Sequence, residues 1–191
     1  GAGAGVWTAA DPGVAPSPDH GRIAADPGAA SDASEPDLPL GAAGAGLGER
    51  LQDFEVPDCD GEMISFSSVL SGAEAVLVNF GAGWCTECIA EAPVLETEIH
   101  AIYEPRGLRV MQVLLQDANI APITRLECRR WRDRFSLSFP VLADTLQETG
   151  AIVGDEGVPL NLLVDDEGVI RMRVHGALPE DLGEQIETLL R

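Results

Sequence analysis

The sequence AVLVNFGAGWCTEC, residues 75–88, decides the fold that we expect. Its first six residues form a short and almost continuous apolar run, which is typical of a strand buried on both faces. Two cysteines, Cys85 and Cys88, follow this strand, and the helical spacing of apolar residues then extends from Cys85 to about Tyr103. The stretch therefore predicts a buried strand, a tight turn and a helix, with a cysteine pair at the junction.

Outward from this stretch, short apolar runs alternate with segments of helical spacing. A small hairpin is predicted before it, in residues 53–66, and a short helical turn through Val69 and Leu70 follows that hairpin. The elements predicted after it are a strand over 108–115, a helix over 120–135, a strand over 139–142, a hairpin over 160–174 and a helix over 179–190. This order predicts an α/β fold, in which a mixed central sheet is flanked by helices on both faces and carries an N-terminal β-hairpin extension.

Residues 1–50 differ in composition from the rest of the chain, since they are mostly Gly, Ala, Pro, Asp and Ser. Such a composition offers few side chains for a core, so we predict a disordered tether there and one folded domain over residues 51–191. The sequence contains no apolar run of about 18 residues, the length that a membrane helix needs. Because the chain does not begin with Met, a membrane tether upstream of residue 1 is compatible with it.

The charge balance and the spacing of Cys and His exclude several classes of function. Acidic residues outnumber basic ones by 32 to 12, so the surface repels phosphate groups and nucleic acid is not an expected partner. A C-x-x-C pair can be half of a zinc site, but the sequence has no second close pair of Cys or His to complete one. We therefore expect no metal and no other cofactor.

The position of the cysteine pair predicts redox chemistry. A thiolate at a helix N-terminus is stabilised by the helix dipole and by unpaired backbone N–H groups, which lower its pKa and make Cys85 the expected nucleophile. Cys88 lies three residues later on the same helix face, close enough to form a disulfide with Cys85 and to resolve a mixed disulfide. The pair is thus suited to exchange electrons with disulfides of other molecules.

Residues 80–88, FGAGWCTEC, resemble the F-x-A-x-W-C-x-x-C active-site segment of thioredoxin-like thiol-disulfide oxidoreductases in the TlpA/ResA and redoxin (AhpC/TSA-like) group. The resemblance extends from Asp53 to the C-terminus and implies a thioredoxin-like fold. It also implies that Val158-Pro159 is the cis-proline loop, which lies against the active-site sulfurs and pairs with extended substrate backbone. Trp84, which immediately precedes Cys85, is expected to line the same substrate site.

The resemblance further implies a group that handles the proton of Cys88. Asn79 stands where cytosolic thioredoxin has a buried Asp, and an amide cannot take a proton. Glu91, three residues beyond Cys88, matches the glutamate that TlpA/ResA-type proteins carry there. A carboxylate buried near Cys88 would have a raised pKa and could accept the proton when that thiol attacks, so we assign this role to Glu91.

Two further cysteines leave two interpretations open. Cys59 lies in the predicted hairpin and Cys128 in the predicted helix, and each could be a small apolar residue of the core. In an oxidising compartment they could instead form a structural disulfide that fixes the hairpin to the core.

We expect this protein to exchange its Cys85–Cys88 dithiol with protein thiols and disulfides, and to be restored by an external reductant. Glu87 lies between the two cysteines and opposes thiolate formation, which favours a reductant over a strong oxidant. The resemblance and the cysteine content favour an extracytoplasmic bacterial protein, periplasmic or membrane-tethered, and we expect a monomer.

Two other functions are alternatives to this one. A peroxiredoxin-like thiol peroxidase shares the fold, but the P-x-x-x-T-x-x-C pattern of those enzymes is missing from the sequence. A tethered, non-catalytic binding domain that keeps its cysteines for stability is the other alternative. Peroxide consumption and insulin reduction distinguish these possibilities.

Overall fold

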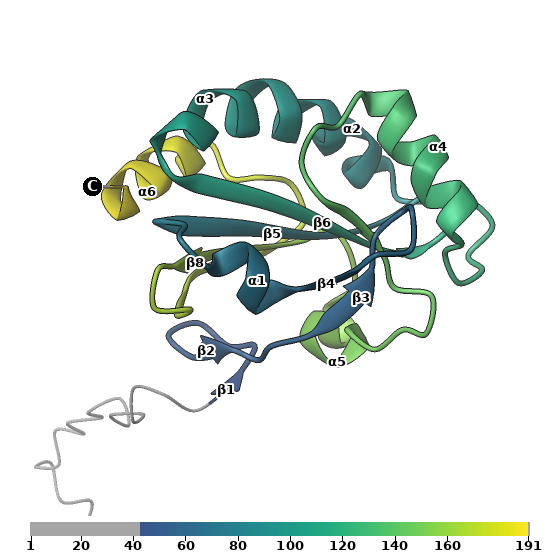
Figure 1. The fold of residues 1–191 in the computed structure, drawn as a ribbon, viewed down its shortest axis with the longest axis horizontal. Helices are drawn as coiled ribbons and strands as arrows, with labels where there is room; N and C mark the ends of the chain where they lie inside the picture. The colour runs from purple at the N-terminus through teal and green to yellow at the C-terminus, as the bar shows by residue number, and fades with distance from the viewer. Residues whose placement is uncertain (1–42, 191) are drawn as a thin grey trace, which may run out of the picture. The chain divides into compact units, whose positions relative to one another are not determined.

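A computed structural model of this chain describes residues 43–190, and most of the tether predicted for residues 1–50 lies outside that range. The central sheet has five strands in the order β7-β6-β5-β8-β9 (Figure 1). These strands are β5 (Ala75–Ala82), β6 (Leu108–Gln116), β7 (Val141–Ala143), β8 (Leu160–Asp165) and β9 (Ile170–His175). Strands β5, β6 and β7 are parallel, whereas β8 is antiparallel to β5 and to β9. The predicted mixed sheet is confirmed.

Helices and a small hairpin cover the two faces of the sheet (Figure 1). One face carries α2 (Thr86–Val94), a π-helical segment (Leu95–His100), α3 (Ala101–Tyr103), α4 (Arg125–Phe135) and α6 (Leu182–Leu189). The other face carries the hairpin of β3 (Glu55–Pro57) and β4 (Met63–Ser65), with α1 (Phe66–Leu70) and α5 (Gly150–Val153). Two short 3-10 turns occupy Glu104–Arg106 and Gly154–Glu156. Among the described residues, no helix has both the length and the apolar character needed to cross a membrane.

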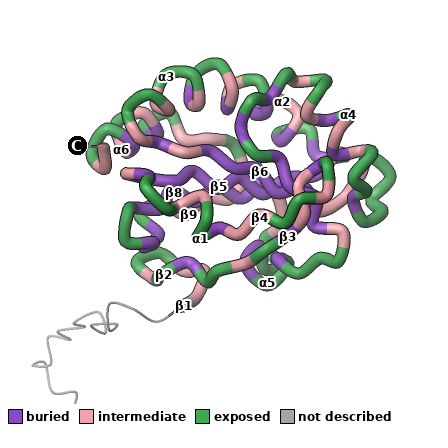
Figure 2. Tube along the Cα trace, viewed as in Figure 1, coloured by how far each residue is buried: buried purple, intermediate pink, exposed green. Residues whose placement is uncertain are grey.

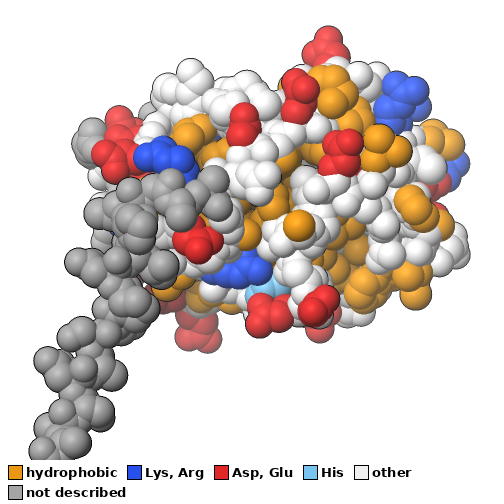
Figure 3. Space-filling view, turned by 90° about the horizontal axis from the view of Figure 1, so that it is seen from below, with side chains coloured by type: hydrophobic (Ala, Val, Ile, Leu, Met, Phe, Trp, Pro, Cys, Tyr) orange, Lys and Arg blue, Asp and Glu red, His pale blue; other side chains and the backbone are white. Residues whose placement is uncertain are grey.

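The sheet separates two apolar cores, because successive side chains of a strand point to opposite faces. On β5, Leu77 packs against the α2 and α4 face, whereas Val76 and Val78 pack against the hairpin face. The strands accordingly form the most buried part of the trace in Figure 2. Figure 3 shows the hairpin side of the molecule, where apolar side chains are interspersed with Asp and Glu.

The helix predicted to begin at Ile120 begins instead at Arg125. Thr124 is its N-cap, and the Thr124 hydroxyl accepts the backbone N–H of Glu127. The five residues before the helix belong to a loop, in which the carboxylate of Asp117 accepts backbone N–H groups of Asn119 and Ala121. A helical N-terminus at Ile120 was therefore wrong, because Thr124 has an extended backbone and its hydroxyl binds the N–H of Glu127, which a longer helix would pair with the carbonyl of Ile123.

Residues 43–50, which we predicted as the end of the tether, are part of the folded unit. Strands β1 (Ala43–Gly44) and β2 (Arg50–Leu51) pair in parallel. Gly48 N donates to the carbonyl of Ile170, and the N–H of Ile170 donates to the carbonyl of Glu49. This segment therefore covers the outer edge of β9 where that strand begins.

Candidate active site

Cys85 caps the N-terminus of α2. Its backbone is extended, with φ −81° and ψ 116°, and its sulfur accepts the backbone N–H of Cys88 at 3.1 Å. The first turn of α2 thus directs at the sulfur a backbone N–H that has no acceptor within the helix. This arrangement stabilises a thiolate once the disulfide is reduced. Cys85 and Cys88 are joined by a disulfide, and both are almost completely buried.

The loop after β6 supports the turn that carries Cys85. Gly83 N donates to the carbonyl of Gln116 at 2.8 Å, and a β-carbon on Gly83 would lie 2.8 Å from the backbone nitrogen of Ala118. The β-carbon would clash with backbone atoms, which cannot rotate away as a side chain could, so only glycine fits at this position. The approach of the two segments fixes where the cysteine turn lies above the sheet.

Trp84 and Val158 flank the cysteine pair. The Trp84 side chain is 43% exposed, and its indole N–H donates to the side-chain carbonyl of Gln116 at 2.9 Å. The Val158-Pro159 peptide bond is cis, and the carbonyl oxygen of Val158 lies 3.8 Å from the sulfur of Cys85. A pocket of about 200 Å³ lies between Trp84 and Val158. The structure therefore brings together Cys85, Trp84 and Val158, three of the residues that the sequence singled out.

Glu91 is buried on the inner side of α2, with 6% of its surface exposed. Its carboxylate accepts the backbone N–H of Leu178 at 2.8 Å and side-chain N–H groups of Asn79 at 3.1 Å and Asn161 at 3.4 Å. Burial raises the pKa of Glu91 above its ordinary value, while these hydrogen bonds, led by that of Asn161, oppose the rise and the nearby charge of Glu87 adds to it.

The side chain of Asn79 lies near both Glu91 and the resolving cysteine. A β-carbon on Gly81 would be 3.6 Å from the sulfur of Cys88 and 3.7 Å from Oδ1 of Asn79, so both atoms border the same small space. The amide nitrogen of Asn79 faces the other way, toward the Glu91 carboxylate. The role that the sequence assigns to Glu91 stays a prediction, and the sequence gave Asn79 no part beyond the loss of an acid.

Two buried amide residues that bind Asn79, Gln112 and Asn161, were missed by the sequence reasoning. Asn79, on β5, accepts the amide N–H of Gln112 on β6 at 2.7 Å and donates to Oδ1 of Asn161 on β8 at 2.7 Å. Gln112 in turn accepts the indole N–H of Trp131, on α4, at 2.7 Å. The sequence contained one signal for this row of amides, which is that each of three otherwise apolar strands carries an Asn or Gln.

The remaining cysteines, Cys59 and Cys128, form a second disulfide that is fully buried. It joins the turn of the β3–β4 hairpin to α4. The guanidinium of Arg129 also donates to the carbonyl of Cys59, and Arg132 forms an ion pair with Asp60 that lowers the pKa of that carboxyl. Of the two interpretations that the sequence left open, the structure contains the disulfide.

Within the described part of the chain, no group of three or more His, Cys, Asp or Glu side chains is arranged to hold a metal ion. The four cysteines of the sequence are all used in the two disulfides. The site itself offers the sulfurs of Cys85 and Cys88, the Glu91 carboxylate and the polar groups around them.

Comparison with known proteins gives three kinds of match. The model of the AhpC/TSA family matches residues 47–173. The thiol-disulfide oxidoreductase ResA of Halalkalibacterium halodurans is 29% identical over 148 residues, which cover 77% of this chain and 78% of that protein. A structure from Chlorobium tepidum, assigned as a thiol:disulfide interchange protein DsbE, is 26% identical with a TM-score of 0.64 and covers 74% of this chain and 96% of its own.

A further solved structure, of a secreted Mycobacterium tuberculosis disulfide oxidoreductase, has a TM-score of 0.58 at 18% identity. It covers 71% of this chain and 96% of its own, and at this identity it bears on the fold alone.

Proposed function

This chain belongs to the AhpC/TSA family, and within that family we propose that it reduces disulfides of partner proteins with the thiols of Cys85 and Cys88. It is a thiol-disulfide oxidoreductase with a thioredoxin-like fold, and its substrates are protein thiols and disulfides. The observation that carries the proposal is the Cys85–Cys88 disulfide at the N-terminus of α2, beside the carbonyl of Val158.

The proposed reaction has two exchange steps. The thiolate of reduced Cys85 attacks one sulfur of the partner's disulfide, which forms a mixed disulfide and releases the partner's other sulfur as a thiolate. Cys88 then loses its proton and attacks the sulfur of Cys85, which releases the second partner thiolate and leaves the Cys85–Cys88 disulfide. Two electrons pass to the partner, and an external dithiol reductant must return two electrons to this pair.

In this scheme Glu91 accepts the proton of Cys88. A buried carboxyl whose pKa is raised binds a proton at higher pH than an exposed one, so it is matched to a thiol that must ionise near neutral pH. Asn79, whose side chain lies near both groups, cannot serve as the acceptor because an amide does not take up a proton.

Trp84, Val158 and Pro159 are proposed to hold the partner. The carbonyl beside Cys85 and the exposed indole leave room for an extended segment whose disulfide lies over Cys85. The indole is positioned by Gln116, so the recognition surface also depends on the end of β6.

The proposed setting is extracytoplasmic and bacterial, with a membrane tether upstream of residue 1 and a monomeric domain. The buried Cys59–Cys128 disulfide supports this setting, because structural disulfides persist in oxidising compartments.

Trapping of the mixed disulfide tests the proposed order of attack. With Cys88→Ser, Cys85 can attack but the intermediate cannot be resolved, so a covalent adduct with a disulfide substrate such as insulin should accumulate. Cys85→Ser is the matched control and should yield no adduct. Adduct formation by Cys85→Ser but not by Cys88→Ser would reverse the two roles. Insulin reduction without consumption of peroxide distinguishes the dithiol reductant from a peroxidase and from a non-catalytic binding domain.

A further inference from the structure

Three amide side chains form a row across the sheet, on the face that α2 and α4 cover. Asn79 is the register partner of Gln112 on β6 and of Asn161 on β8. Directly opposite residues of neighbouring strands point to the same face, so the three amides meet side by side. All three are completely buried.

The two ends of this row fix its direction. At one end the indole of Trp131 can only donate, so Gln112 must turn its carbonyl oxygen toward Trp131 and its nitrogen toward Asn79. At the other end Asn161 donates to the backbone carbonyl of Gly176 at 3.2 Å, and a carbonyl can only accept. Each amide therefore has one orientation that satisfies both ends.

The direction of the hydrogen bonds in this row determines which groups donate to the Glu91 carboxylate. Asn79 has two amide hydrogens, of which one binds Asn161 and the other binds the Glu91 carboxylate. Asn161 divides its hydrogens between the carbonyl of Gly176 and the other oxygen of Glu91. With the backbone N–H of Leu178, the carboxylate is held by three donors from three different segments.

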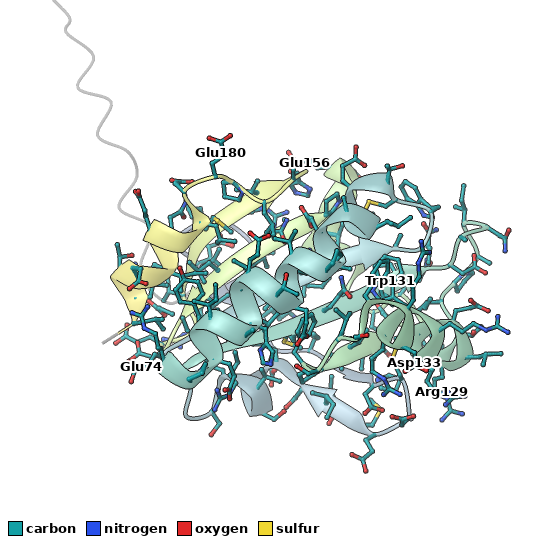
Figure 4. All side chains as sticks on the ribbon, turned by 90° about the horizontal axis from the view of Figure 1, so that it is seen from above. Glu74, Arg129, Trp131, Asp133, Glu156 and Glu180 are labelled. Carbon is teal, nitrogen blue, oxygen red and sulfur yellow. A yellow bond between two sulfur atoms is a disulfide. The ribbon has the colours of Figure 1, made fainter. Side chains whose placement is uncertain are left out.

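We propose that the row Trp131, Gln112, Asn79 and Asn161 is a positioning device for the Glu91 carboxylate, and that Trp131 on α4 is its remote anchor. Figure 4 shows Trp131 on the side of α4 that faces α2, away from the labelled Asp133. The proposal rests on the proposed function, in which Glu91 takes the proton of Cys88. It deepens that function by making a residue of a different helix part of the proton-handling site.

The expected effect has a definite sign. Donors that face a carboxylate stabilise its charged form, and a chain of hydrogen bonds polarises each member, so loss of a link weakens the donors at Glu91. The carboxyl should then keep its proton to higher pH. The charged group nearest on its own helix is Glu87, and the resolving Cys88 lies one turn earlier. The β5, β8 and 176–178 segments face Glu91 with amides and backbone groups.

The test follows the Glu91 carboxyl itself by carbon-13 NMR in the oxidised protein, with the resonance assigned by its loss in Glu91→Gln. Trp131→Phe keeps an aromatic ring but removes the indole N–H, and it should shift the titration to higher pH. Asn161→Thr should cause a larger shift in the same direction, because one hydroxyl hydrogen cannot serve two acceptors. Phe135→Leu is the matched control, since Phe135 packs on the Trp131 ring at 4.8 Å without entering the row, and it should cause no shift.

A Glu91 titration that is the same in Trp131→Phe as in Phe135→Leu overturns the proposal. If Trp131→Phe does not fold, Gln112→Met breaks the row from the strand side and must produce the upward shift instead. The readout needs no exchange reaction, so it is separate from the proposed function. If the titration shifts as expected but Glu91→Gln leaves the pH profile of insulin reduction unchanged, the row positions Glu91 and the catalytic role of Glu91 is the part that fails.

Discussion

The two disulfides of this domain close loops of very different length, which allows their effect on stability to be compared within one protein. Cys59 and Cys128 are 69 residues apart in sequence, whereas Cys85 and Cys88 are 3 apart. In the chain-entropy model a cross-link stabilises the fold by restricting the unfolded chain, and this restriction grows with the logarithm of the loop length. We predict that replacing Cys59 and Cys128 together with Ala destabilises the domain far more than replacing Cys85 and Cys88 together.

The loop lengths set the magnitudes. For the separation of 69 residues the model gives about 4.4 kcal/mol at 25 °C, and for the separation of 3 about 1.6 kcal/mol. The difference of about 2.8 kcal/mol isolates the effect of loop length, since both double variants remove two almost completely buried sulfur atoms.

Urea unfolding followed by circular dichroism, without reductant, measures both losses from the midpoint and the slope of the transition. The Cys59→Ala/Cys128→Ala variant should have the lower midpoint by a clear margin. Wild-type protein treated with a dithiol reductant should fall at or below that midpoint, because both cross-links are then open. Equal losses in the two double variants would refute the loop-length reasoning and would mean that local packing of the sulfurs dominates.

Other expected outcomes concern the site. Asn79→Asp places a second carboxyl about 3.1 Å from that of Glu91, and because two carboxylates so close do not both ionise readily, the acid limb of the pH profile of insulin reduction should move to higher pH. An unmoved limb would contradict the assigned role of Glu91. Gly83→Ala puts a β-carbon 2.8 Å from the backbone of Ala118 and should slow insulin reduction by displacing the cysteine turn. Gly183→Ala, whose β-carbon would meet the Tyr103 hydroxyl at 3.0 Å, is its control and should leave the rate unchanged.

Local patterns were sufficient to predict the elements of the fold. The apolar run of β5, the cysteine turn and the start of α2 follow from periodicity within one stretch of chain, and the structure places them where the sequence predicts. The start of α4 was missed because apolar spacing was followed back to Ile120. The pair Thr124 and Glu127, which is a capping signal, was present in the sequence and would have given the correct start.

The site was predictable only where it is local in sequence. Cys85, Cys88 and Glu91 lie on one turn-and-helix segment, so their spacing places them together. The row through Asn79 depends instead on which residues of β6 and β8 lie opposite it, and apolar runs do not specify strand register in a sheet buried on both faces. The pairing of Cys59 with Cys128 was also left open, because local sequence patterns do not show which distant residues come together. Their Cα atoms are 5.1 Å apart only because of the tertiary fold.

Strand β7 lies at one edge of the sheet, and the hairpin turn covers that edge. The N–H of Cys59 donates to the carbonyl of Val141, and Asp58 pairs with Leu142. The three residues of β7 are apolar and buried. If the hairpin detached from the sheet, β7 would become an exposed apolar edge strand that could pair with another chain. The Cys59–Cys128 disulfide therefore also limits aggregation, because it holds the hairpin over this edge. Prolonged exposure to strong reductant should make the protein self-associate before it loses its helices.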